Sequence, residues 1–224
     1  MKPPPRKPER SGANFRITSI ETQKRDSSRV NVYLDGAFAF GLPKDVVIRQ
    51  HLNEGDEIDE DLIANVLLQD ELARAKQKAL AFLSYRSRSI QELGSKLKTK
   101  GFSERTIIRV IDDFVRVGLL DDRAFAAAYA QTRMIQKPMS KRLLKKELMF
   151  KGVPESTANT AIEEIYGNQT ELEVAVSLVR KRFAGKPDIN EQKIKKRLSD
   201  FLARRGFSWE IISEAMRELN GHSQ

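Results

Sequence analysis

Apolar and polar residues alternate near the start of the chain, and this pattern predicts strands. Val30, Val32 and Leu34 alternate with Asn31 and Tyr33, and an Asp-Gly pair follows at residues 35–36. Asp-Gly between two such runs predicts a tight hairpin, because its turn needs positive φ at both central residues. We therefore expect a small β element, with residues 37–40 as the returning strand and residues 17–23 as a third strand.

Beyond residue 53 the pattern becomes helical. Residues 53–56 (NEGD) predict a turn, and the acidic residues 59–61 are typical of a helix N-terminus, where they interact favourably with the helix dipole. From there to the C-terminus apolar residues recur at intervals of three and four. The remaining chain is expected to be helical.

The helical part contains an internal repeat centred on a glycine. Three segments align without gaps: LKTKGFS at 97–103, LMFKGVP at 148–154 and LARRGFS at 202–208. Leucines stand eight and four residues before each glycine, and a second apolar set follows it at helical spacing. Each set lies on one helical face, and the glycine can take the left-handed conformation of a helix C-cap. The apolar positions are Leu93, Leu97, Ile107, Val110, Ile111 and Phe114, then Leu144, Leu148, Ala158, Ala161, Ile162 and Ile165, then Leu198, Leu202, Ile212, Ala215, Met216 and Leu219.

Each two-helix unit has a further helix upstream, at about residues 71–85, 122–135 and 170–183. Capping signals agree with this division. Ser89 with Glu92 and Thr170 with Glu173 have the spacing of capping boxes, and Asp121 is placed as an N-cap.

The predicted fold is therefore mainly α: tandem three-helix repeats forming an elongated, curved body, with a small N-terminal β-hairpin element. We expect a disordered basic, proline-rich arm at 1–14 and a small β element plus linker helix at 15–70. Helical repeats 1, 2 and 3 follow at 71–121, 122–169 and 170–224.

Composition narrows the class of protein. The chain has 224 residues, no cysteine and a net charge of +9, so disulfides and thiolate zinc sites are excluded and an anionic partner is indicated. Residues 1–70 carry ten basic and twelve acidic side chains, so all of the excess charge lies in the repeats. No apolar run is long enough for a membrane span or a secretory signal, which predicts a cytoplasmic protein without a membrane partner.

The sequence offers no catalytic constellation. His51 and His222 are the only histidines, one beside a turn and one near the C-terminus, so neither is placed as a held general base. Residues 36–41 have the glycine spacing of a phosphate loop, but Leu42 and Pro43 stand where that loop needs Lys and Ser or Thr. We expect no enzymatic activity, no metal and no cofactor.

The basic residues are the positive signal for function. Lys141, Arg142, Lys145 and Lys146 gather on one helical face with almost no neutralising partner, which indicates an anion-binding surface. Several other basic residues recur in register with the glycines or lie near the ends of first helices. These further candidates are Lys151, Arg86, Arg88, Lys96, Lys100, Lys195, Lys196, Arg204 and Arg205.

Structural roles compete with binding roles at several of these positions. Lysines commonly solvate the outside of a helix, which is the favoured interpretation of Lys96 and Lys100, whereas both interpretations stay open for 141–146. Arginines such as Arg86 and Arg88 also stabilise the end of a helix through its dipole. Phe102 and Phe207 follow their glycines directly; they are suited to base stacking, but the apolar contact that accompanies a helix C-cap is favoured.

Several segments resemble the RecX family of bacterial RecA regulators. They are RSRSIQEL at 86–93, KLKTKGF at 96–102, GLLDDRAFA at 118–126, Arg133, and KELMFKGV at 146–153. The resemblance covers about 71–219 and is most specific at 86–153. Trp209 departs from the pattern because Glu104 and Glu155 occupy that place in the other repeats, and a β element at 15–50 occurs only in some members.

This resemblance implies a non-enzymatic regulator that binds the RecA filament on DNA. It would mainly inhibit RecA's ATPase, strand-exchange and co-protease activities, with single- and double-stranded DNA as nonspecific partners. Independently of the resemblance, we expect a monomer. The resemblance also implies roles in DNA repair, recombination and the SOS response. The alternative is a sequence-nonspecific DNA-binding helical repeat protein without a RecA partner.

The predicted elongation can be tested by small-angle scattering. A compact globule of this length would have a radius of gyration of about 17 Å. Stacked repeats lengthen a molecule, so the monomer should give a clearly larger value. A value near that of the globule would mean that the repeats fold back on one another.

Overall fold

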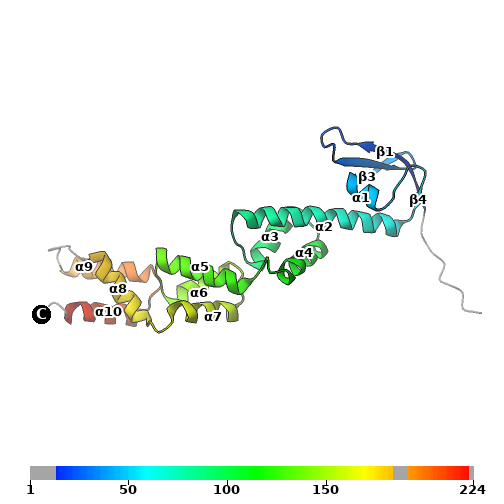
Figure 1. The fold of residues 1–224 in the computed structure, drawn as a ribbon. Coiled ribbons are helices and arrows are strands. Elements are labelled where there is room, and N and C mark those ends of the chain that lie inside the picture. The colour runs from blue at the N-terminus through cyan, green and yellow to red at the C-terminus, as the bar shows by residue number, and fades with distance from the viewer. Residues whose placement is uncertain (1–13, 184–190, 222–224) are drawn as a thin grey trace, which may run out of the picture. The chain divides into compact units, whose positions relative to one another are not determined.

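The structure, a computed structural model, describes residues 14–183 and 191–221. The predicted arm, apart from Asn14, and His222 lie outside the described residues. The chain divides into two compact units, residues 1–81 with 100–110, and residues 82–99 with 111–224. Each is described by itself below, with the elements labelled in Figure 1.

The first unit opens with a four-stranded antiparallel sheet in the order β3-β2-β1-β4. Its strands are β1 (Phe15–Thr22), β2 (Arg29–Leu34), β3 (Ala37–Pro43) and β4 (Glu57–Ile58). Asp35 and Gly36 have φ of 48° and 83°, which confirms the hairpin turn, and β1 confirms the third strand. The two-residue β4 and the short helix α1 (Lys44–Arg49) had no clear signal in the sequence, because both are too short for a periodicity.

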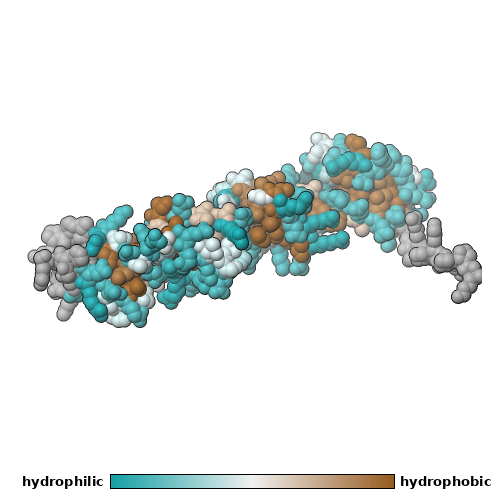
Figure 2. Space-filling view, turned by 60° about the horizontal axis from the view of Figure 1, so that its bottom comes forward, coloured by the Kyte–Doolittle hydropathy of each residue, from teal (hydrophilic) through white to brown (hydrophobic). Residues whose placement is uncertain are grey.

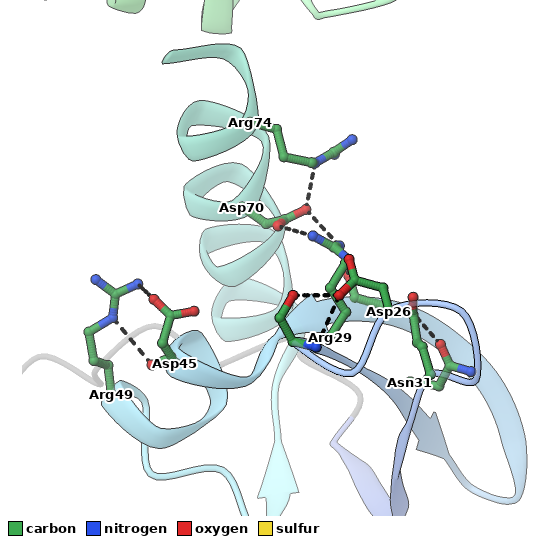
Figure 3. Close-up of polar contacts among 10 residues, drawn as sticks. Asp26, Arg29, Asn31, Asp45, Arg49, Asp70 and Arg74 are labelled. Atoms are coloured by element: carbon green, nitrogen blue, oxygen red, sulfur yellow. Dashed lines mark hydrogen bonds and ion pairs between the residues drawn. The ribbon is translucent and has the colours of Figure 1, made fainter. Parts of the chain in front are cut away.

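One face of this sheet packs on α1 and α2, and an ion-pair cluster ties β2 to α2. The core includes Val32, Leu42 and Val66. Asp70 is 3% exposed and accepts hydrogen bonds from Arg29 Nη1 at 3.1 Å and Arg74 Nε at 2.8 Å (Figure 3). A buried carboxylate needs such partners, so this cluster fixes the sheet on the helix.

Helix α2 (Glu60–Tyr85) corrects one expectation about the first repeat. Its first helix was expected from about residue 71, with a separate linker helix before it, but a single helix runs through both. Asp59 caps it, because its Oδ1 accepts a hydrogen bond from Leu62 N at 2.8 Å. No glycine or proline interrupts residues 60–85, so nothing in the sequence ends the helix earlier.

The rest of the described chain is helical, as predicted, and gives tandem three-helix repeats (Figure 1). Capping also follows the sequence at two of three places. Thr170 and Glu173 form a reciprocal capping box, and Asp121 caps α5. Ser89 Oγ accepts from Glu92 N at 3.1 Å, but the Glu92 carboxylate bonds Arg86 instead, so this capping box is only half formed. The helices are α3 (Ile90–Thr99), α4 (Glu104–Arg116), α5 (Asp122–Gln136), α6 (Lys141–Phe150), α7 (Glu155–Tyr166), α8 (Glu171–Phe183), α9 (Glu191–Ala203) and α10 (Trp209–Gly221).

The predicted apolar stripes form the core of the repeats. The six leucines before the glycines are each at most 5% exposed, and Phe207 is buried, as expected of an apolar contact at a helix C-cap. The stripes of α7 and α10 join one core with α5, α6, α8 and α9. The side chain of Leu219 lies outside the described residues.

The repeat glycines adopt the predicted left-handed conformation: Gly101, Gly152 and Gly206 all have φ of +83°. In the second unit this turn also has a packing role. A Cβ built on Gly206 would lie 2.6 Å from Leu143 Cβ, and one on Gly152 would lie 2.4 Å from Gln91 Cβ. The turn of one repeat therefore presses against the start of the middle helix of the preceding repeat.

Hydrogen bonds connect the same places. Ser140 N donates to Arg205 O at 3.0 Å, and Ser89 Oγ donates to Lys151 O. Each serine also caps its own helix, since Ser140 Oγ accepts from Leu143 N. The middle helices of the repeats thus follow one another end to end: the end of α9 meets the start of α6, and the end of α6 meets the start of α3.

This packing predicts that Gly206→Ala costs more stability than Gly118→Ala. Both glycines have positive φ, at +83° and +74°, so both changes lose about 1 kcal/mol from backbone strain. Only Gly206 has neighbours within the reach of a new Cβ, so its change should cost at least about 1 kcal/mol more. Urea unfolding followed by helical circular dichroism measures both; equal losses would contradict the close inter-repeat packing.

Candidate nucleic-acid interface

The four clustered basic residues of α6 separate into two rows. Lys141 Nζ lies 3.1 Å from a carboxylate oxygen of Glu163, and Lys145 Nζ lies 2.6 Å from Glu155 Oε1. Both glutamates belong to α7, which packs beside α6. The expectation that these lysines have almost no neutralising partner is therefore wrong: helix packing supplies partners that are distant in sequence. The Lys145 ammonium also lowers the pKa of Glu155 through their hydrogen bond.

The second row of α6 points away from these partners. Arg142, Lys146 and Phe150 follow at intervals of four residues, which aligns them along one side of a helix, and all three are exposed. Arg142 Nη2 makes one long hydrogen bond, to Gly206 O at 3.4 Å. Within residues 14–183 and 191–221, Lys146 has no hydrogen-bond or ion-pair partner. We call this set the outer row of α6.

The middle helices of the other repeats carry equivalent outer rows. Counted back from the repeat glycine, the same three positions are exposed in α3 and in α9. The rows follow one another because the helices do: Arg142 reaches the turn after α9, and Phe150 borders the row of α3. The outer row of α3 is Gln91, Ser95 and Thr99, and that of α9 is Lys196, Asp200 and Arg204.

A small hollow of about 230 Å³ lies where the outer rows of α6 and α3 meet. Its walls carry hydroxyl, amide and ammonium groups and a single large apolar side chain, Phe150, which is 88% exposed. The lining residues are Gln91, Glu92, Ser95, Lys96, Thr99, Phe150 and Lys151.

The acidic member of the hollow is neutralised. Arg86 donates two hydrogen bonds to the Glu92 carboxylate, at 2.8 and 2.9 Å, and Lys151 Nζ lies 3.4 Å from it. These bonds, those of Arg86 first, lower the pKa of Glu92 below its ordinary value. With Lys96 beside them, the surroundings carry more positive than negative charge and suit an anion.

The other predicted residues are placed differently. Arg88 is 9% exposed and donates to Phe82 O, and Arg205 donates to Pro138 O at 2.6 Å, so both guanidinium groups are held by the protein itself. Lys195 is half-buried, whereas Lys196 and Arg204 belong to the outer row of α9. Lys100 is exposed and belongs to the first unit.

Phe150 was not among the site residues predicted from the sequence. The buried stripe of α6 consists of Leu144 and Leu148, eight and four residues before the repeat glycine Gly152. Phe150 stands two residues before that glycine and therefore lies off the stripe. An aromatic residue there must face away from the core.

The mixed hydrophobicity of the surface is visible in Figure 2, where apolar patches interrupt a largely hydrophilic exterior.

An ion pair and a hydrogen bond from α5 hold α6 in place, and we call this set of Arg133, Tyr129 and Glu147 the buttress. Arg133 donates to both carboxylate oxygens of Glu147, at 2.7 and 2.6 Å, and Tyr129 Oη donates to the same carboxylate at 3.0 Å. The Arg133 hydrogen bonds are the main cause of the lowered pKa of Glu147. Arg133 thus orients the helix that carries the outer row.

Within the described residues, no group of His, Asp and Glu side chains is arranged to hold a metal ion. Over the same ranges, no helix combines the length and the apolar character needed to cross a membrane. His51, the described histidine, is exposed at a turn with φ of 52°.

Comparison with known families identifies all four parts of the chain. A model described as the regulatory protein RecX N-terminal domain matches residues 15–59. Models of the first, second and third three-helix domains of RecX match residues 75–114, 121–162 and 169–216.

Relatives and a solved structure agree with this. Regulatory protein RecX of Clostridioides difficile is 34% identical over 91% of this chain and 95% of its own. That of Bacillus licheniformis is 33% identical over 91% of this chain and 77% of its own. A crystal structure of regulatory protein RecX, 28% identical, has a TM-score of 0.62 and covers 91% of this chain and 99% of that one.

The buttress predicts a pH-dependent cost for Glu147→Gln. Because the folded-state pKa of Glu147 is lowered, its stabilisation is complete above the ordinary value of 4.5 and is lost as pH falls through the folded-state pKa. The variant should lose about 1 to 3 kcal/mol at neutral pH, and the gap to the unaltered protein should close in acid. Urea unfolding at pH 7 and at pH 3 to 4 measures it.

Glu163→Gln is the matched control. It also removes a carboxylate paired with a cation, but that carboxylate side chain is 68% exposed, so the loss should stay below about 0.5 kcal/mol. A Glu147→Gln cost that does not change with pH would assign the effect to packing rather than to charge.

Proposed function

Because the chain belongs to the RecX family of regulatory proteins, we propose that it is a non-enzymatic regulator that binds the RecA filament on DNA and mainly inhibits it. The inhibited activities are RecA's ATPase, strand exchange and co-protease action. It works as a monomer in the cytoplasm, without metal or cofactor, in DNA repair, recombination and the SOS response. The observation that carries the proposal is the succession of exposed outer rows on α9, α6 and α3.

Electrostatics supports DNA as part of the target. Lys196, Arg204, Arg142 and Lys146 are exposed along these rows, and Asp200 is the acidic member among the nine positions. Cations that lie in succession can each displace a counterion from a phosphate backbone. They give affinity without reading sequence, which suits a regulator that must act wherever the filament forms.

Repetition supports a repeating partner. The outer rows occupy equivalent positions in three successive repeats, although their side chains differ. A surface built of successive equivalent helices suits a partner built of successive equivalent subunits around DNA. Binding to more than one subunit would restrain the changes between subunits that ATP hydrolysis and strand exchange require.

The alternative, a sequence-nonspecific DNA-binding protein without a RecA partner, uses the same cations. The two proposals differ in stoichiometry. A filament-specific regulator inhibits RecA's single-stranded-DNA-dependent ATPase at amounts too small to coat the DNA. A plain DNA-binding protein inhibits only by competing for the DNA, so its effect disappears when DNA is in excess.

The outer row of α6 should contribute more to filament binding than Lys141 and Lys145, the two cations of α6 that are paired with α7. We expect Arg142→Gln with Lys146→Gln to raise the half-inhibitory concentration for RecA's ATPase at least about tenfold. The salt dependence of filament binding should flatten by about 0.7 log-log units for each phosphate that the variant no longer neutralises. Fluorescence anisotropy of labelled filaments at several salt concentrations measures both affinity and slope.

Lys141→Gln with Lys145→Gln is the matched control, because it removes the same charge from the same helix but from residues already paired with α7. Neutralising Lys2 and Arg6 in the N-terminal arm controls for net charge elsewhere in the chain. Equal inhibition by all three variants would show that no surface of α6 is specific. A larger loss of binding from the Lys141 and Lys145 variant would assign the binding role to the other side of the helix.

A further inference from the structure

We propose that the hollow beside Phe150 is a stacking site for an unpaired base of single-stranded nucleic acid, with Lys96 and Lys146 contacting the neighbouring phosphates. The inference rests on the proposed function in that it places DNA on the outer rows. It adds what those cations alone cannot provide: discrimination between single and double strands.

Phe150 is presented as a platform rather than packed as a core residue. It is the last residue of α6, its side chain is 88% exposed, and the close packing of the following turn on α3 holds the helix end. An aromatic ring fixed on a helix and open to solvent can accept any base on its face, because every base has a π surface. A base stacked on the ring would remove much of this exposed apolar surface from water, which favours binding.

The chemistry around the ring favours a nucleotide over an apolar protein segment. Ser95, Lys96, Thr99 and Gln91 line the hollow with hydroxyl, ammonium and amide groups. Thr99 Oγ1 donates to Ser95 O at 2.9 Å and keeps its acceptor capacity. An apolar partner would bury these groups without hydrogen bonds, which is costly, whereas base edges and phosphate oxygens satisfy them.

Spacing along the outer row supports the phosphate contacts. Lys146 stands four residues before Phe150, a separation of about 6 Å along a helix, and Arg142 stands four residues before Lys146. Lys96, on α3, lines the hollow together with Phe150. A strand whose base stacks on Phe150 therefore has cations from both α6 and α3 near its adjacent phosphates.

Stacking makes the site selective. In a duplex the bases stack on one another and are not available to a side chain, whereas in a single strand they are. Phosphates are accessible in both. Phe150 should therefore contribute to single-strand affinity and contribute little to duplex affinity.

Tryptophan fluorescence tests the stacking directly. Trp209 is the sole tryptophan, so Trp209→Phe with Phe150→Trp places one reporter in the hollow. A thymidine oligonucleotide of about 15 nucleotides should quench this reporter in a saturable manner. Ile135→Trp in the same background is the control: Ile135 is 75% exposed on α5, a helix that carries no outer row, and a tryptophan there should not be quenched.

Affinity measurements complete the test. Phe150→Ala, an exposed change that should leave helicity unaltered, is expected to weaken binding of the oligonucleotide about 5- to 100-fold and duplex binding less than twofold. Unchanged single-strand affinity, or no quenching of the reporter at 150, overturns the proposal. So does an equal loss for both forms of DNA.

The outcomes separate this proposal from the regulator proposal. If the unaltered protein inhibits RecA's ATPase but binds no free oligonucleotide, the stacking site is wrong and the regulator stands. If Phe150→Ala weakens RecA inhibition while oligonucleotide affinity is unchanged, Phe150 binds protein and the stacking site is again wrong. If the oligonucleotide stacks on residue 150 but RecA does not respond, only the regulator proposal fails.

Discussion

The close approach of a glycine turn to the start of the preceding middle helix determines the geometry of the repeats. Gly152 and Gly206 permit it twice over, because they adopt positive φ and leave no Cβ between the two backbones. A serine at the start of each helix reinforces the approach by donating a hydrogen bond to a carbonyl of the turn. Ser89 donates from its hydroxyl to Lys151 O, and Ser140 donates from its backbone N–H to Arg205 O. Without that approach the middle helices would be set apart by a side chain, and their exposed rows would not continue from one repeat to the next.

Placing α6 between two neighbours has consequences for its charges. On one side, Glu155 and Glu163 of α7 neutralise Lys141 and Lys145, so these lysines help to hold the two helices together at modest energetic value. On another side, Arg133 fixes Glu147 through two short bonds. Over residues 14–183 and 191–221, Arg142 and Lys146 have no carboxylate partner and face solvent, and for this reason the proposed binding surface is built on them.

The sequence predicted the repeats because their signals are local. Glycine periodicity, buried stripes and the Asp35-Gly36 hairpin depend on neighbours within a few turns of chain, and each was confirmed. The pairing of Lys141 with Glu163 depends on two helices lying side by side, which local periodicity does not specify. The length of α2 was not predicted because the helix boundaries were inferred from the repeat. The capping box at Glu92 was expected to be complete, but Arg86 competes for its carboxylate. The exposure of Phe150 was predictable from its position off the stripe, once the direction of the core was known.

The three outer rows share a backbone position but not a chemistry. Gln91, Ser95 and Thr99 in α3 offer neutral hydrogen-bonding groups, whereas α6 offers two cations followed by an aromatic ring. The row of α9, in which Asp200 separates Lys196 from Arg204, offers charge without an aromatic. If the repeats only attracted phosphates, three rows with the same cations would bind DNA equally well, since nonspecific attraction depends mainly on the number of cations. If a strand lies along the rows as we propose, it is held by charge at one end, stacked in the middle and hydrogen-bonded at the other, so that the repeats give the surface a direction as well as an affinity.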